Sequence, residues 1–185
     1  MISAVISGHL SGRIITLLAG GLSWGVVHHN ARIFYSRMHG TLSKRWNNFI
    51  LFLAILSIIT LPLAGIFDTH NHRHIHRPLI VIYLFSFIHH VKFVADAIVK
   101  HKYLYSECDQ AKIRWISWNR HIFFYLNWFF GFCFAYYRHT GPVPYIEWVL
   151  FVDVLYFYCL INTVNHNFDS THQPYLEKAA YSKKT

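Results

Sequence analysis

Five long apolar stretches are the feature that most restricts the fold of this chain. A helix needs about 20 residues to cross about 30 Å of hydrocarbon, because it rises about 1.5 Å per residue. The stretches that meet this length are 13–34, 49–67, 79–99, 116–137 and 145–168. We therefore predict an all-α fold. It would be a polytopic transmembrane helical bundle of about five spans, a single membrane domain over 1–185 with a tail at 169–185.

The composition supports a membrane environment and argues against other classes of protein. Hydrophobic residues make up 54% of the chain and charged residues 14%, against about a quarter charged in soluble domains. Aromatic residues reach 18% and crowd the apolar stretches and their edges, as they do at lipid–water boundaries. The basic residues behind the net charge of +9 are scattered through short loops, so we expect no nucleic-acid partner. Three cysteines without CxxC spacing predict no metal centre, and we expect no cofactor.

The loops between the apolar stretches differ in basic charge, and this difference orients the chain. Eleven Lys and Arg residues lie in one set of alternate loops and three in the other. The richer set is Arg32, Arg37, Lys44, Arg45, Lys100, Lys102, Lys112, Arg114, Lys178, Lys183 and Lys184, and the poorer set is Arg73, Arg77 and Arg138. Because cytosolic loops carry the excess of basic residues, we predict a lumenal N-terminus, lumenal loops at 68–77 and 138–144, and a cytosolic C-terminal tail.

Polar and ionisable residues inside the predicted spans are candidates for function, because burying them in hydrocarbon is costly. For any single histidine, a structural hydrogen bond between helices is the more common explanation. His90 lies roughly 17 Å and Asp153 roughly 12 Å from the lumenal surface, and Asn127 could join them. Lys92 and Asp96, spaced i,i+4, are expected to pair. A second set lies nearer the cytosol and comprises His28, His29, Asp96, Arg120, His121, Asn162 and His166.

A histidine-rich loop, FDTHNHRHIHR, lies between the second and third predicted spans. It packs five candidate ligands into nine residues: Asp68, His70, His72, His74 and His76. Alternate residues of an extended chain point to one side. Because imidazoles ligate zinc and arginines suit phosphate, a metal or phosphate site is one interpretation. The simpler interpretation, a solvated lumenal loop, is the one we favour.

Several motifs of the chain occur together in a known family. In the fourth span, WNRHIFF contains Arg120 and CFAYYRH ends with Arg138 and His139. In the last span, LINTVNH contains Asn162 and His166. These segments resemble the C-terminal half of the post-GPI attachment to proteins factor 2 family, which belongs to the FRAG/DRAM/SFK group of polytopic membrane proteins.

The resemblance extends to the N-terminal half, with differences. His76 and His90 have counterparts in the family, and MISAVISG resembles the stretch after the family's first transmembrane helix. Family members usually have six spans, so the resemblance implies either a short form that lacks the first span or a divergent member. The acidic–aromatic pair of the last span is displaced, because Leu155 precedes Tyr156 and the nearest acid is Asp153.

The resemblance implies a role in the lipid remodelling of GPI anchors during their maturation. In that scheme a lyso-GPI-anchored protein receives a new saturated fatty acid, which supports its stable surface expression. The expected partners are membrane lipids and GPI-anchored proteins, and the expected location is the Golgi membrane, with the endoplasmic reticulum membrane as a second. Whether the family performs the acyl transfer or assists it stays open. The alternative is a non-catalytic membrane regulator or scaffold of the DRAM/SFK type.

If the chain is catalytic, depth in the membrane selects His90 and Asp153. Chemistry on the glycerol of a GPI anchor must occur within roughly 15 Å of the lumenal surface. Asp153 meets this limit and His90 comes close. We predict that the two face each other, with His90 as general base and Asp153 orienting it. The cluster around His121 and His166 lies too deep and is assigned to helix packing. A lipid or ion carrier is a third hypothesis, without the internal repeats that would favour it.

Overall fold

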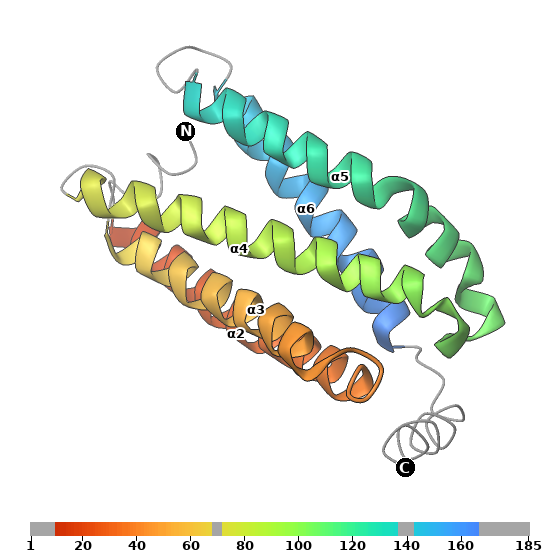
Figure 1. Ribbon diagram of the computed structural model, residues 1–185. Helices are drawn as coiled ribbons and strands as arrows, with labels where there is room; N and C mark the ends of the chain where they lie inside the picture. Colours follow the sequence, from red (N-terminus) through yellow and green to blue (C-terminus); the bar gives the residue numbers. More distant parts are fainter. Residues whose placement is uncertain (1–9, 68–71, 137–142, 167–185) are drawn as a thin grey trace.

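The computed structural model describes residues 10–67, 72–136 and 143–166. Its long helices are α2 (Leu10–Arg37), α3 (Lys44–Ile66), α4 (Arg73–Lys100), α5 (Gln110–Tyr136) and α6 (Val143–His166) (Figure 1). Two short 3₁₀ helices, η1 (Lys102–Leu104) and η2 (Glu107–Asp109), connect α4 to α5. No strand occurs in the described ranges, so the predicted all-α fold is confirmed. Each predicted span begins inside a different one of the five long helices.

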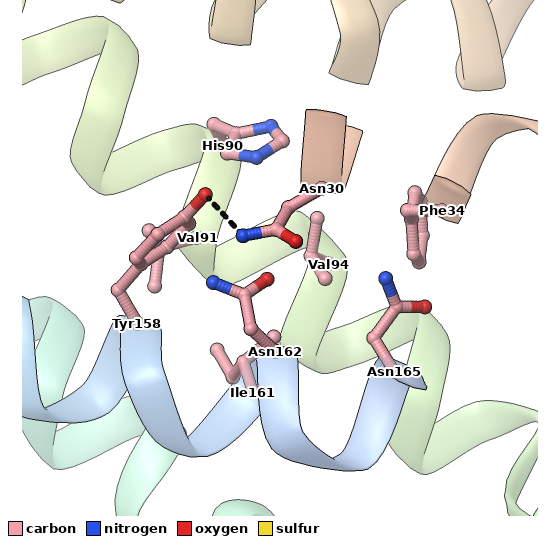
Figure 2. Close-up of a pocket in the computed structure, with 9 residues that line it drawn as sticks. All are labelled: Asn30, Phe34, His90, Val91, Val94, Tyr158, Ile161, Asn162 and Asn165. Carbon is pink, nitrogen blue, oxygen red and sulfur yellow. Dashed lines mark hydrogen bonds between the residues drawn. The ribbon is translucent and has the colours of Figure 1, made fainter. Parts of the chain in front are cut away.

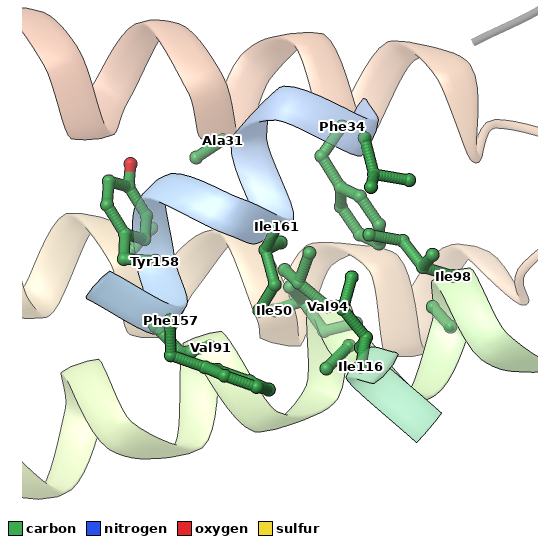
Figure 3. Packing of buried hydrophobic residues seen from close by; sticks show 14 of the residues in the cluster. Ala31, Phe34, Ile50, Val91, Val94, Ile98, Ile116, Phe157, Tyr158 and Ile161 are labelled. Carbon is green, nitrogen blue, oxygen red and sulfur yellow. The ribbon is translucent and has the colours of Figure 1, made fainter. Parts of the chain in front are cut away.

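The helix α4 lies at the centre of the bundle, with α2 and α3 on one side and α5 and α6 on the other (Figure 1). α3 packs along both α2 and α4, while α5 packs along α4 and α6. α6 also reaches α2, so helices from the two ends of the chain meet. The core draws on all five helices, and Phe34, Ile50, Ile98, Ile116 and Phe157 are each at most 2% exposed (Figure 3).

The connection between α2 and α3 is explained by three residues. Gly40 adopts a φ of 86°, a left-handed conformation that residues with a Cβ rarely adopt. The Ser43 hydroxyl accepts a hydrogen bond from the backbone N–H of Trp46 at 3.4 Å, which satisfies one of the unpaired amides at the start of α3. Asn47 donates from Nδ2 to the carbonyl of Tyr35 at 2.9 Å and joins the two helices beyond the turn.

The histidine-rich segment is helical from Arg73 onward, which corrects the prediction of a solvated loop over that part. α4 begins before the predicted start of the third span and runs through Pro78. His76 is buried, and its Nδ1 lies 2.8 Å from the carbonyl oxygens of both Ala64 and Phe67. Since a carbonyl oxygen only accepts, His76 donates to the C-terminal end of α3, where a helix leaves its last carbonyls unpaired.

The described part of this segment holds no cluster of metal ligands. His72 and His74 are exposed, while the His76 side chain is bonded to the end of α3. Across the described ranges, no group of three or more His, Cys, Asp and Glu side chains could hold a metal ion. Asp68 and His70, the other members of the predicted cluster, lie outside the described residues.

Part of the outer surface of the bundle is apolar. One face of α5 carries Trp118, Ile122, Tyr125, Phe129 and Phe132, which are between 61% and 81% exposed. Two helices of the described chain, Lys44–Ile66 and His74–Lys100, are long and apolar enough to cross a membrane by length and composition. Only 39% of the apolar window in each is buried inside the bundle. The count of five spans and their orientation stay predictions.

Candidate functional site

A small polar cavity lies where α2, α4 and α6 meet. Its lining mixes apolar and polar side chains: Asn30, Phe34, His90, Val91, Val94, Tyr158, Ile161, Asn162 and Asn165 (Figure 2). The cavity volume of about 10 Å³ is close to the minimum that one water molecule needs. Polar groups inside an apolar bundle are costly, so this cavity is the strongest candidate for a functional site.

Asn30 of α2 links two side chains of α6 through hydrogen bonds. Its Nδ2 donates to the hydroxyl of Tyr158 at 3.3 Å (Figure 2), and its Oδ1 lies 3.0 Å from Nε2 of His166. Because an amide oxygen can only accept, Nε2 of His166 carries the proton of that bond. The ring of His29 stacks on His166, with 6.2 Å between the centroids. Polar contacts thus tie α2 to α6 over about two helical turns.

His90 lies on the α4 side of the cavity and is bonded to a third helix. It is 3% exposed, and its Nδ1 lies 3.0 Å from the backbone oxygen of Ile50 in α3. The carbonyl only accepts, so Nδ1 carries a proton and Nε2 of the neutral imidazole keeps its lone pair. His90 can therefore accept a proton or a hydrogen bond through Nε2.

Asn165 adds a buried polar atom without a protein partner. Its side chain is 1% exposed, and its Oδ1 has no hydrogen-bond partner among the described residues. Nearly all buried amide oxygens in proteins are satisfied by protein or by ordered water. An ordered water molecule next to Oδ1 would satisfy this one.

Three of the residues selected from the sequence meet at this cavity. His90 and Asn162 line it, and His166 is bonded to Asn30 at its edge. Depth counted along each helix separately had placed His90 apart from Asn162 and His166. In the structure the three residues lie at the same cavity, so the division into two sets by depth is corrected. The hydrogen bond from His166 to Asn30 of α2 agrees with the assignment of His166 to helix packing.

The structure does not bring His90 and Asp153 together in the predicted pair. Asp153 accepts a hydrogen bond from Nδ2 of Asn127 in α5 at 2.7 Å, so Asn127 joins Asp153 as expected. Asp153 does not line the cavity, and it precedes Tyr158 by roughly 7.5 Å along α6. No hydrogen bond links His90 to Asp153 among the described residues, so a catalytic role for either must be argued without the other.

Arg120 belongs to an ionic cluster between α4 and α5. Lys92 and Asp96 form the expected i,i+4 ion pair. Asp96 also pairs with Nε of Arg120 at 3.1 Å, which cross-links the two helices away from the cavity. The other two motif residues of this span, Arg138 and His139, lie outside the described residues.

Outside the predicted spans, the connection between α4 and α5 buries two titratable groups. Burial lowers the pKa of the His101 imidazole, and the charge of Lys100 lowers it further. Burial raises the pKa of the Tyr105 hydroxyl, against the opposite effect of the Arg37 guanidinium. In both groups, burial favours the neutral form.

Three polar residues of the cavity were not selected from the sequence. Asn30 and Asn165 lie within predicted spans, so the argument that selected Asn162 could have found them too. Tyr158 gave no signal, because tyrosine is common in the apolar stretches of this chain.

Comparison with known proteins adds no family assignment. A scan against models of protein families, a search of curated proteins and a search of solved structures each found no match. The resemblance of the motifs to the post-GPI attachment to proteins factor 2 family therefore stays a prediction, and the function has to be argued from the residues and the cavity.

Proposed function

We propose that this chain is a five-span membrane protein that takes part in the lipid remodelling of GPI anchors. Its N-terminus would face the lumen and its C-terminus the cytosol, in the Golgi membrane and also in the endoplasmic reticulum membrane. The step is the fatty-acid reacylation of lyso-GPI-anchored proteins, which supports their stable surface expression. Its partners are membrane lipids and GPI-anchored proteins.

Exposed apolar side chains support the membrane part of the proposal. The face of α5 from Trp118 to Phe132 is roughly 21 Å long and is strongly exposed. A soluble bundle rarely leaves an apolar patch of this kind in water, whereas hydrocarbon accepts it without cost. The split of eleven basic residues against three between alternate loops supports the orientation.

The observation that carries the functional proposal is the gathering of motif residues at one cavity. His90, Asn162 and His166 come from two helices far apart in the sequence, and each matches a motif position of the family that the chain resembles. A shared site explains why all three positions carry polar side chains. Arg120, a further motif residue, has its own role in joining α4 to α5.

In the catalytic form of the proposal, His90 is the general base. The backbone carbonyl of Ile50 accepts the Nδ1–H of His90, which leaves Nε2 as the base. Nε2 takes the proton from the glycerol hydroxyl of the lyso-lipid while that hydroxyl oxygen attacks the acyl carbonyl. The bond from the acyl group to its donor then breaks, and the proton passes from Nε2 to the leaving group. Tyr158 accepts from Asn30, so its own O–H is free to donate to the oxyanion.

The size of the cavity favours a second candidate, a non-catalytic membrane regulator or scaffold of the DRAM/SFK type. About 10 Å³ admits a water molecule and excludes a glycerol backbone, so catalysis requires α6 to separate from α2. In this second interpretation the same hydrogen bonds hold the helices in place, and the acyl transfer belongs to a partner protein.

Rescue of cells that lack this chain tests the proposal and separates its two forms. The wild-type chain should restore the surface level of GPI-anchored proteins, measured by flow cytometry, while other membrane proteins stay unchanged. His90→Gln, at equal abundance, should fail to rescue if His90 is the base, whereas rescue would favour the scaffold. Arg114→Gln, at an exposed position of α5, is the matched control and should rescue. Normal surface levels without the chain would refute the proposal.

A further inference from the structure

A second hollow lies on the outside of α2, near its C-terminal end. It has about 400 Å³ of open space and is lined by His28, His29, Arg32, Ile33 and Ser36. His166 contacts residues of both sites: it forms a hydrogen bond with Asn30 of the polar cavity, and its ring stacks on that of His29 in the hollow. The hollow is far larger than that cavity and is open to its surroundings.

The lining of the hollow is basic. No aspartate or glutamate contributes to it, and Arg32 is exposed without an ion pair to any carboxylate of the described residues. A guanidinium presents several N–H donors in a planar fork that matches a phosphate group. The two imidazoles of His28 and His29 add further ring N–H donors. This set of donors suits a phosphate, and no carboxylate of the described ranges lines the hollow.

The position of the hollow relative to the predicted span selects a lipid as the source of that phosphate. Arg32 lies at the end of the span 13–34, and Arg37 follows at the end of α2. The exposed Trp24 lies two turns earlier, with its ring 6.0 Å from that of His28. A basic side chain at the end of a span is typical of the membrane boundary, whereas Trp24 lies near the middle of the predicted span, at the depth of the lipid chains. On the cytosolic side, basic residues there attract anionic lipids.

We propose that the hollow formed by His28, His29 and Arg32 binds the phosphate of an anionic phospholipid in the cytosolic leaflet. Arg32 pairs with two phosphate oxygens, and the two histidines donate from their ring nitrogens. The acyl chains lie along exposed apolar side chains of the same helix, which include Trp24 and Val26. The site rests on the proposed spans and their orientation, but not on the remodelling of GPI anchors, which belongs to the lumenal leaflet.

Native mass spectrometry of the purified full chain in detergent tests the site. Dioleoylphosphatidate is the probe, and dioleoylphosphatidylcholine is the control lipid without net charge. We expect the wild-type chain to retain phosphatidate, and Arg32→Gln to bind it about tenfold more weakly, which corresponds to about 1.4 kcal/mol. Arg114→Gln removes another exposed arginine near the same predicted boundary and should bind as the wild type does.

Three results would overturn the proposal. They are unchanged phosphatidate binding by Arg32→Gln, an equal loss in Arg114→Gln, or equal retention of phosphatidylcholine. Inorganic phosphate is added as a competitor, and displacement of the lipid by an equal concentration of phosphate would show that a free anion, and not a lipid, is the ligand.

A second pair of variants keeps the test decisive if Arg32→Gln does not fold. Arg32→Lys keeps the charge and loses the planar fork, so it should show a partial loss of phosphatidate binding. His29→Gln removes one imidazole and should also weaken binding, while its unfolding midpoint stays close to that of the wild type. Wild-type affinity in both variants would contradict the site.

Discussion

Replacing Asn30 by alanine removes the two side-chain hydrogen bonds that join α2 to α6 among the described residues. Hydrogen bonds between membrane helices contribute on average about 0.6 kcal/mol and at most about 1.7 kcal/mol each. The buried Tyr158 hydroxyl would lose one of its two amide partners and keep Asn162, whereas His166 is exposed and can find another partner. We therefore expect Asn30→Ala to lower the free energy of unfolding by about 1 to 2 kcal/mol.

The assay is reversible unfolding of the purified chain in mixed micelles, followed by tryptophan fluorescence. Tyr158→Phe removes only the hydroxyl, so the cycle with Asn30→Ala should give a coupling energy of about 0.6 kcal/mol or more. Asn119→Ala is the control, because the hydrogen bond of its side chain within the described residues goes to the carbonyl of Trp115 in its own helix. A coupling energy of zero, or a larger effect from Asn119→Ala, would refute the assigned contacts.

Three further predictions concern the ionic cluster, pH and topology. Arg120→Gln removes the ion pair with Asp96 and should lower the free energy of unfolding in the same assay by at most about 1 kcal/mol. A larger loss would contradict the view that Arg120 contributes to stability through this ion pair alone. Because burial lowers the pKa of folded His101 below 6.5, the stability it contributes is complete above that pH and falls as pH drops through the folded pKa. His101→Gln should flatten the dependence of the unfolding midpoint on acid pH, and an unchanged slope would contradict this. In intact microsomes, protease should cleave a tag at Thr185 and spare one inserted at Asn71, and cleavage at Asn71 without detergent would reverse the orientation.

The helices could be predicted because long apolar runs and local spacing carry the signal. A stretch such as 49–67 is too apolar for a loop, and α3 covers all but its last residue. The pairing of Lys92 with Asp96 is confirmed because residues four apart lie on the same face of any helix. α4 begins six residues before the predicted third span, and the hydrogen bonds of His76 to the end of α3 are tertiary contacts that no local sequence pattern predicts.

The contacts between helices could not be predicted, because they depend on the rotation and crossing of each helix. Depth alone suggested that His90 and Asp153 face each other. In the structure α6 directs Tyr158 and Asn162 to the cavity, while Asp153 bonds Asn127 of α5. Asn30 completes the cavity from α2, a helix whose contact with α6 is not visible in the sequence. His90, Asn162 and His166 were therefore selected from the sequence, but the helix contacts that bring them to one cavity could not be predicted.

Lipid mass spectrometry of GPI-anchored proteins from cells that lack this chain tests the central claim most directly. In these cells, lyso forms of the GPI anchors should accumulate, and anchors with a newly added saturated fatty acid should be depleted. Re-expression of the wild-type chain should restore the normal anchor lipids. Anchor lipids that are identical with and without the chain would contradict a role in GPI-anchor remodelling.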